Sequence, residues 1–188
     1  MRRAALTVLF ALVVAPGLAS AQAPAAAADA ATCVPASIGC PVFERYTNHK
    51  FGFSVDLPTF LEKKAADADG RGQPFEYGSK ARVRAWAMYD NPPMTVQQLY
   101  GDWSRRDGLT FKALAMNTWV VRGRDGGRLY YSRSILADNI ITTIEVTYEA
   151  MLSEPMEPIL ARMGASLMTI DGEGVRARAR LAVPAQAP

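Results

Sequence analysis

From residue 109 to residue 148, apolar and polar side chains alternate in segments separated by residues that favour tight turns. The turns fall at Asn117, at Gly126-Gly127 and at Asp138-Asn139. A period of two is that of a half-buried strand. Four strands are therefore expected, over residues 110–116, 118–124, 128–136 and 140–148. Strands joined by such short turns pair with their neighbours in antiparallel fashion, so this part of the chain predicts an antiparallel sheet.

Helical spacing on both sides of this meander predicts two helices that cover the sheet. Thr95 and Gln98 match a capping box, which begins a helix expected to run to about Arg106. Ser153 is expected to cap a last helix, with Pro155 in its first turn. Further strands are expected over residues 42–46, 51–57, 73–77 and 81–90. The fold class that follows is α+β, with an antiparallel β-sheet flanked by helices in an α/β/α sandwich.

The first 21 residues have the pattern of an export signal. Two arginines precede a short apolar stretch, and Ala19-Ser20-Ala21 offers a signal peptidase site. The stretch is shorter than the roughly 20 residues that span a bilayer. We therefore expect residues 1–21 to be a cleaved signal peptide, with no transmembrane segment left after cleavage and a periplasmic or secreted product. A permanent N-terminal anchor is the alternative.

The rest of the chain divides into a spacer, one domain and a tail. Residues 22–41 form an Ala-rich spacer that includes the loop between Cys33 and Cys40. Residues 42–170 are long enough for a single domain, and residues 171–188 have the composition of a disordered tail. Two close cysteines in an exported chain usually form a disulfide, which is expected here. The alternative, a reactive or metal-binding pair, lacks the C-x-x-C spacing.

Charge argues against nucleic acid as a partner. The whole chain has a formal net charge of +3. Removal of Arg2 and Arg3 with the signal peptide leaves 19 of the 21 basic residues against 18 acidic ones. A nearly neutral chain lacks the basic surface that binds phosphate backbones.

No motif for catalysis, metal binding or a cofactor is evident, so an enzyme is not expected. His49 is the only histidine and lies in an expected turn, whereas a serine hydrolase would also need a nucleophile elbow. Asp67 and Asp69 begin like a calcium loop, but the glycine comes early and position twelve is Gly78, so a turn is expected. Eight aromatic residues are expected in the core: Phe51, Phe53, Tyr100, Trp103, Phe111, Trp119, Tyr131 and Tyr148.

Arginines on the expected strands are the strongest candidates for a binding site. On one face, their guanidinium groups would suit a carboxylate or phosphate. The alternative is a solvated sheet face with cross-strand pairs to Glu145 and Asp125. The candidate residues are Arg82, Arg84, Arg122, Arg124 and Arg133.

The stretch Tyr46-x-Asn48-x-x-Phe51-Gly52-Phe53-Ser54-Val55-x-Leu57-Pro58 resembles the opening of PsbP-like domains, above all their bacterial envelope relatives. Asp69-Gly70, Gly123-x-Asp125-Gly126 and Tyr130-Tyr131 follow in the expected order, so that the resemblance covers about residues 43–168. It implies an antiparallel sheet between helices and a binding or assembly role. No functional residue carries over, because the matching positions are structural ones.

The function expected from these observations is that of a non-catalytic envelope protein that binds a protein or assembly partner. The alternative is a binder of a small anionic ligand or lipid headgroup through the strand arginines. An enzyme is the third reading.

Overall fold

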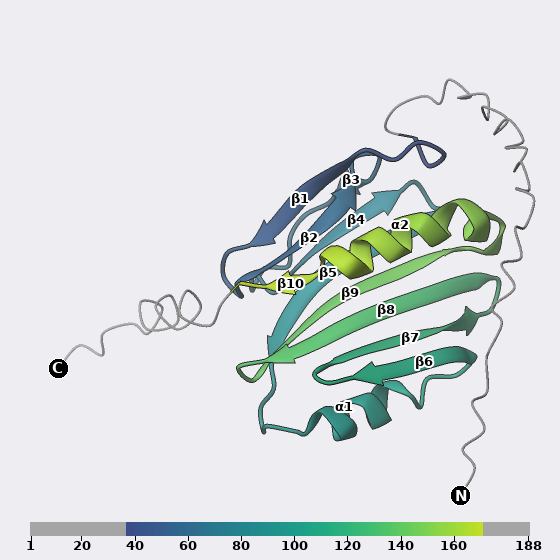
Figure 1. Ribbon diagram of the computed structural model, residues 1–188. Coiled ribbons are helices and arrows are strands. Elements are labelled where there is room, and N and C mark those ends of the chain that lie inside the picture. Colours follow the sequence, from purple (N-terminus) through teal and green to yellow (C-terminus); the bar gives the residue numbers. More distant parts are fainter. Residues whose placement is uncertain (1–36, 171–188) are drawn as a thin grey trace, which may run out of the picture. The chain divides into compact units, whose positions relative to one another are not determined.

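Strands make up about half of residues 37–170, the part of the chain that the computed structural model describes (Figure 1). The larger of two antiparallel sheets has seven strands in the order β3-β4-β5-β9-β8-β7-β6. They are β3 (Glu62–Lys63), β4 (Gly72–Tyr77), β5 (Ala81–Tyr89), β6 (Leu109–Ala115), β7 (Thr118–Asp125), β8 (Arg128–Ala137) and β9 (Ile140–Glu149). The smaller sheet, in the order β1-β2-β10, comprises β1 (Phe43–Asn48), β2 (Phe53–Pro58) and β10 (Met168–Thr169).

Strands β6 to β9 form the predicted four-strand meander, each antiparallel to the next. The turn between β8 and β9 uses Asp138 at φ 51° and Asn139 at φ 58°, the left-handed backbone that a tight hairpin requires. Gly126 at φ 57° provides the same conformation between β7 and β8. The turn signals in the sequence are therefore confirmed.

Two helices were predicted and both are present. In α1 (Val96–Trp103), the Thr95 side chain accepts a hydrogen bond from the Gln98 backbone N–H at 3.2 Å, which confirms the capping box. The prediction for the second helix was wrong at its start, because Ser153 is the first residue of α2 (Ser153–Ser166) and not its cap. A 3₁₀ turn, η1 (Ala150–Leu152), precedes it, and the Ser153 backbone N–H already donates to a carbonyl of that turn.

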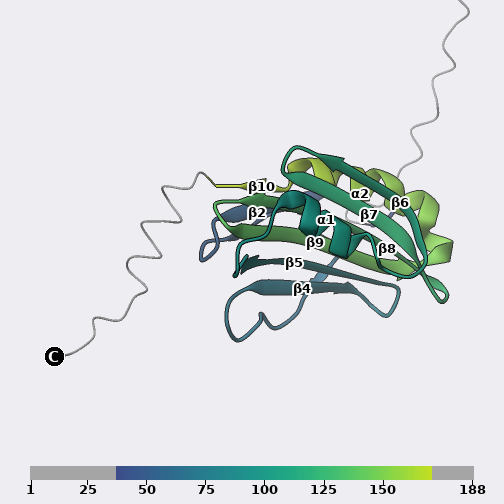
Figure 2. The ribbon, with the colours of Figure 1, turned by 90° about the horizontal axis from the view of Figure 1, so that it is seen from below.

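The seven-stranded sheet has two covered faces. One face, here called the α2 face, presents residues such as Val83, Ala85 and Ile144 and is covered jointly by α2 and the smaller sheet. The opposite face, here called the α1 face, presents Trp119 and Ile141 and packs against α1. Figure 2 shows the molecule from the end at which α1 lies. The predicted α+β class, with an antiparallel sheet between helices, is therefore confirmed.

His49 and the segment with Asp67 and Asp69 were expected to form turns, and both do. His49 lies in the turn between β1 and β2. Asp67 and Asp69 lie in the segment between β3 and β4, where Asp67 pairs with Arg84 at 2.7 Å and Asp69 with Arg71 at 2.8 Å. Within residues 37–170, no group of three or more His, Cys, Asp or Glu side chains is arranged to hold a metal ion.

Candidate binding groove

The strand arginines divide between the two faces of the seven-stranded sheet. On β9, Glu145 is the register partner of Arg84, and its neighbour Ile144 is the register partner of Arg133. Because successive residues of a strand point to opposite faces, Arg84 and Arg133 lie on opposite sides. The same register places Arg82 with Arg84 on the α1 face, and Arg122 and Arg124 with Arg133 on the α2 face. The five arginines therefore do not form one site.

On the α1 face, the two arginines are held by carboxylates. Arg84 pairs with Asp67 at 2.7 Å, and its guanidinium lies over the Trp86 ring at 5.3 Å. Arg82 lies 3.8 Å from Glu76. Arg82 and Glu76 are register partners across β5 and β4, so that this contact is a cross-strand pair of the kind in the alternative interpretation. Asp67 lies between β3 and β4, and neither carboxylate is one of the two predicted.

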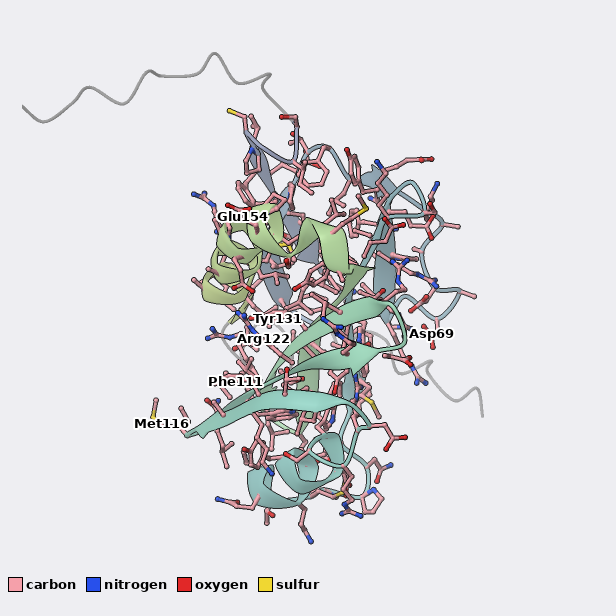
Figure 3. The ribbon with its side chains drawn as sticks, turned by 90° about the vertical axis from the view of Figure 1, so that its right-hand side faces the viewer. Asp69, Phe111, Met116, Arg122, Tyr131 and Glu154 are labelled. Atoms are coloured by element: carbon pink, nitrogen blue, oxygen red, sulfur yellow. The ribbon has the colours of Figure 1, made fainter. Side chains whose placement is uncertain are left out.

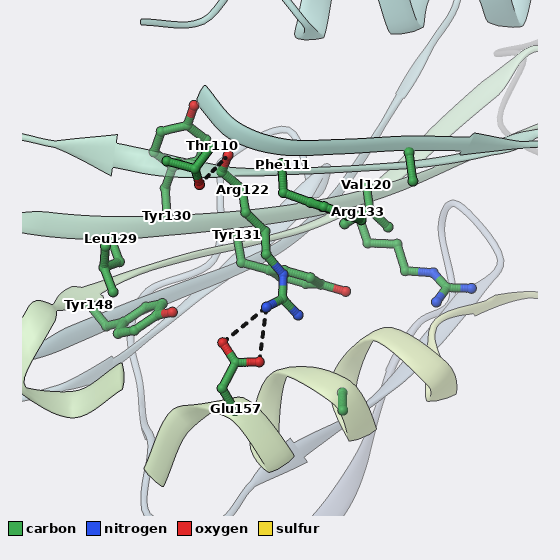
Figure 4. Close-up of a pocket in the computed structure, with 13 residues that line it drawn as sticks. Thr110, Phe111, Val120, Arg122, Leu129, Tyr130, Tyr131, Arg133, Tyr148 and Glu157 are labelled. Atoms are coloured by element: carbon green, nitrogen blue, oxygen red, sulfur yellow. Dashed lines mark hydrogen bonds and ion pairs between the residues drawn. The ribbon is translucent and has the colours of Figure 1, made fainter. Parts of the chain in front are cut away.

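The α2 face carries a groove where α2 leaves the far strands of the sheet uncovered. Helix α2 packs against β2, β8 and β9, and the sheet continues past it to β7 and β6 (Figure 1). The resulting cavity, here called the α2 groove, has a volume of about 710 Å³ (Figure 4). It is lined by Thr110, Phe111, Ala113, Val120, Arg122, Gly123, Leu129, Tyr130, Tyr131, Arg133, Tyr148, Glu157 and Ala161.

Arg122 already has an anionic partner in the groove. Its Nη1 donates to both carboxylate oxygens of Glu157 on α2, at 2.9 and 3.0 Å. The guanidinium also lies 5.2 Å from the centre of the Tyr131 ring. This pair joins β7 to α2 across the groove and neutralises one of the groove's two positive charges.

Arg133 differs from Arg122 because it has no anionic partner. None of the ion pairs formed within residues 37–170 includes Arg133. Its Nε is buried and has no hydrogen-bond partner. Figure 4 shows the side chain extending from β8 between the sheet and α2. Of the five predicted arginines, only Arg122 and Arg133 line the groove, and Arg124 lies at the exposed end of β7.

One wall of the groove continues onto the surface of the molecule. Phe111, Arg122 and Tyr131 are register partners across β6, β7 and β8, so that all three lie on the same face (Figure 3). Phe111 is 51% exposed, which contradicts its predicted place in the core. The reason is that β6 is the outermost strand at its end of the sheet and α2 does not reach it. Met116, in the turn that follows, is 92% exposed.

Tyr131 on the groove floor has a raised pKa. Burial is the main cause, and the positive charges of Arg133 and Arg122 partly offset it. In the unfolded chain this phenol has a pKa of about 10. A phenol whose pKa is higher in the folded state stabilises the fold at all pH values below the unfolded pKa, and that contribution is lost as the pH rises through the folded pKa.

We therefore expect the free energy of unfolding to decline above about pH 10, and to decline less steeply in a Tyr131→Phe variant. Urea unfolding at pH 8 to 11, with phenolate absorbance recorded in parallel, measures both effects. Arg133→Gln should raise the pKa of Tyr131 further, because it removes a positive charge beside the phenol. Equal slopes for the parent and the Tyr131→Phe variant would contradict the assignment.

Comparison with known proteins supports the fold and adds no function. No family model matches the chain, and no curated protein does. The structure is similar to the solution structure of cyanobacterial PsbP (CyanoP) from Synechocystis sp. PCC 6803, with a TM-score of 0.52 and 10% identity over 71% of this chain and 95% of that one. It also matches a crystal structure from Bacteroides thetaiotaomicron VPI-5482, with a TM-score of 0.46 and 11% identity over 69% of this chain and 49% of that one.

The chain therefore has a PsbP-like fold, as the resemblance in its sequence predicted. The second match spans about half of the Bacteroides protein and carries no further argument. The predicted disulfide stays a prediction, because Cys33 lies outside the described residues. The signal peptide and the tail lie outside them too. Among the described residues, no helix is long and apolar enough to cross a membrane.

Proposed function

We propose that the mature protein is a non-catalytic component of the cell envelope that binds a protein partner at the α2 groove. Export is supported by the signal pattern over residues 1–21, and a periplasmic location follows from it. Binding is supported by one observation above all: exposed Phe111 stands at the border between an open groove and a free sheet edge.

The free edge of β6 favours an extended segment as the occupant. A two-residue turn closes the β6–β7 hairpin, so that Ala115 and Thr118 form its hydrogen-bonded closing pair. Hydrogen-bonded pairs alternate along an antiparallel ladder. The backbone groups of Lys112 and Leu114 therefore point away from β7, along the outer edge of the sheet. An added strand could pair with these groups while its side chains reach the groove.

The composition of the groove indicates the chemistry of this segment. Phe111, Val120 and Leu129 offer apolar surface. The groove is lined by two arginines and one carboxylate, that of Glu157, so that its net charge is positive by one. Charge complementarity therefore favours an extended apolar segment that carries an acidic residue.

Site-specific photo-crosslinking tests this proposal. The photoreactive residue p-benzoylphenylalanine replaces Phe111 in the full chain, produced in the organism that encodes it. Tyr89 provides a matched control position, because it is an aromatic residue that is 52% exposed and lies outside the groove. We expect one defined polypeptide adduct from position 111 and none from position 89. Ala113→Glu, which fills the groove beside Phe111 and cancels its excess positive charge, should abolish the adduct.

Two outcomes would overturn the proposal of a protein partner. The first is the absence of any polypeptide adduct at position 111. The second is an adduct whose yield is the same at position 89 or is unchanged by Ala113→Glu.

The second candidate is a small amphipathic anion, and the size of the groove favours it. Small-molecule sites have volumes of about 300–1,000 Å³ and combine apolar walls with a few polar groups, and the α2 groove has about 710 Å³. An adduct at position 111 with the mass of a lipid or metabolite, in place of a polypeptide, would establish this alternative.

A further inference from the structure

Resting on the proposed function, we infer that Arg133 is the anchor of the α2 groove and binds a carboxylate of the incoming segment. Eight other arginines in residues 37–170 form ion pairs with an Asp or Glu: Arg45, Arg71, Arg82, Arg84, Arg105, Arg106, Arg122 and Arg162. Arg128 donates to three backbone carbonyls. Arg133 is the arginine that lines a cavity without such a partner.

The Nε of Arg133 identifies the atom at which a hydrogen-bond acceptor is missing. Buried polar groups in folded proteins nearly always have a hydrogen-bond partner, and an unpaired one destabilises the fold. The Nε of Arg133 is buried and has none within the described residues. Because Nε has no contact with solvent, a carboxylate reaches it only when the Arg133 side chain turns toward the groove; Nε–H and one Nη–H then bind the carboxylate together, which is the bidentate geometry arginine favours. One bound carboxylate would therefore satisfy this orphan donor.

Arg133 lies beside Tyr131, whose phenol oxygen accepts a hydrogen bond from the guanidinium, and both side chains lie beneath α2. Gly164 of α2 faces this part of β8, and a Cβ at that position would lie 2.3 Å from the Tyr131 Oη and 3.5 Å from the Arg133 Cδ. The absence of a side chain at Gly164 leaves room for both residues beneath the helix. Arg133 is therefore positioned by the packing of α2 on β8.

The charge of the groove favours a monoanion. Glu157 on α2 already forms an ion pair with Arg122. A doubly charged phosphate monoester would meet that carboxylate as well as the arginines, whereas a single carboxylate matches the one uncompensated positive charge. Asp, Glu or a C-terminal carboxylate on an apolar segment has this chemistry.

The experiment measures the yield of the position 111 adduct in variants of Arg133. We expect Arg133→Gln to reduce the yield at least tenfold and Arg133→Lys to restore part of it. Arg82→Gln, a strand arginine on the α1 face, is the matched control and should leave the yield unchanged. Mass spectrometry then locates the crosslinked segment of the partner. Exchanging its acidic residue for the corresponding amide should reduce the yield as much as Arg133→Gln, with no further loss in the combination.

Glu157→Gln gives a second test that leaves Arg133 intact. It removes the carboxylate that competes inside the groove, so that the yield should rise. This test stands even if the Arg133 variants unfold, which their thermal unfolding midpoints report. Full yield from folded Arg133→Gln, or a lower yield from Glu157→Gln, would overturn the inference while the protein-binding proposal stands. No adduct from the parent chain at position 111 would instead defeat the proposal itself.

Discussion

Replacing Phe53 with alanine is expected to lower the free energy of unfolding by about 3–5 kcal/mol, the range for a fully buried phenylalanine. Phe53 is 0% exposed and belongs to the core that joins β2 and α2 to the seven-stranded sheet. Its ring also meets Tyr46 edge to face at 6.1 Å. The truncation removes apolar burial and leaves a cavity that the strands around it can fill only in part. Chemical denaturation of the purified domain measures the change.

Phe111→Ala is the matched control, with the same change of side chain at a position that is 51% exposed. We expect it to cost less than about 1 kcal/mol, because surface substitutions away from special features have small effects. Its effect should fall on partner binding instead. A loss from Phe111→Ala as large as that from Phe53→Ala would mean that β6 packs against something that residues 37–170 do not include.

The second large effect is expected at Gly164, where alanine should destabilise the protein by about 1–3 kcal/mol, as overpacking does. Inside an exposed helix the same change stabilises by about 1 kcal/mol. Here the new Cβ would lie 2.3 Å from the Tyr131 Oη, so that the ring or the helix must move. Tyr131 is buried between β8 and α2 and has little room to do so.

Tyr131→Phe should reverse the sign of the Gly164→Ala effect. Without the hydroxyl, the nearest ring atom, Cζ, lies 3.5 Å from the added Cβ, an ordinary contact. The double variant should therefore be more stable than Tyr131→Phe alone, because only the gain in helix propensity remains. A double-mutant cycle measured by urea unfolding gives the coupling. Additive effects would contradict the close approach of α2 to β8.

Local signals in the sequence were sufficient for much of this fold. The turns at Gly126 and Asp138-Asn139 depend on backbone angles that a few residue types adopt, so that they were predictable without tertiary information. In the turn between β6 and β7 the positive φ falls on Met116 and not on Asn117. The same holds for the capping box of Thr95, whose hydrogen bonds join residues three apart. The prediction that Ser153 caps α2 rested on its residue type alone. It failed because the 3₁₀ turn before Ser153 decides where α2 begins.

Contacts between distant segments were not predictable in this way. Strand β10 has two residues and pairs with β2, although residues 59–167 separate the two strands in the sequence. The sequence pattern therefore led to one sheet where the protein has two. The prediction for Phe111 failed for a related reason, since an alternating strand shows which residues share a face but not whether a helix covers that face.

The sequence by itself determined the α+β class, the antiparallel meander and the alternation that separates the two faces of each strand. These follow from periodicity and turn chemistry, which act over a few residues. Only the tertiary structure decided that Arg84 and Arg133 lie on opposite faces, that Arg122 is neutralised by Glu157, and that α2 stops short of β6. The site depends on register and on the place where a helix packs, and both are set by burial of the whole core.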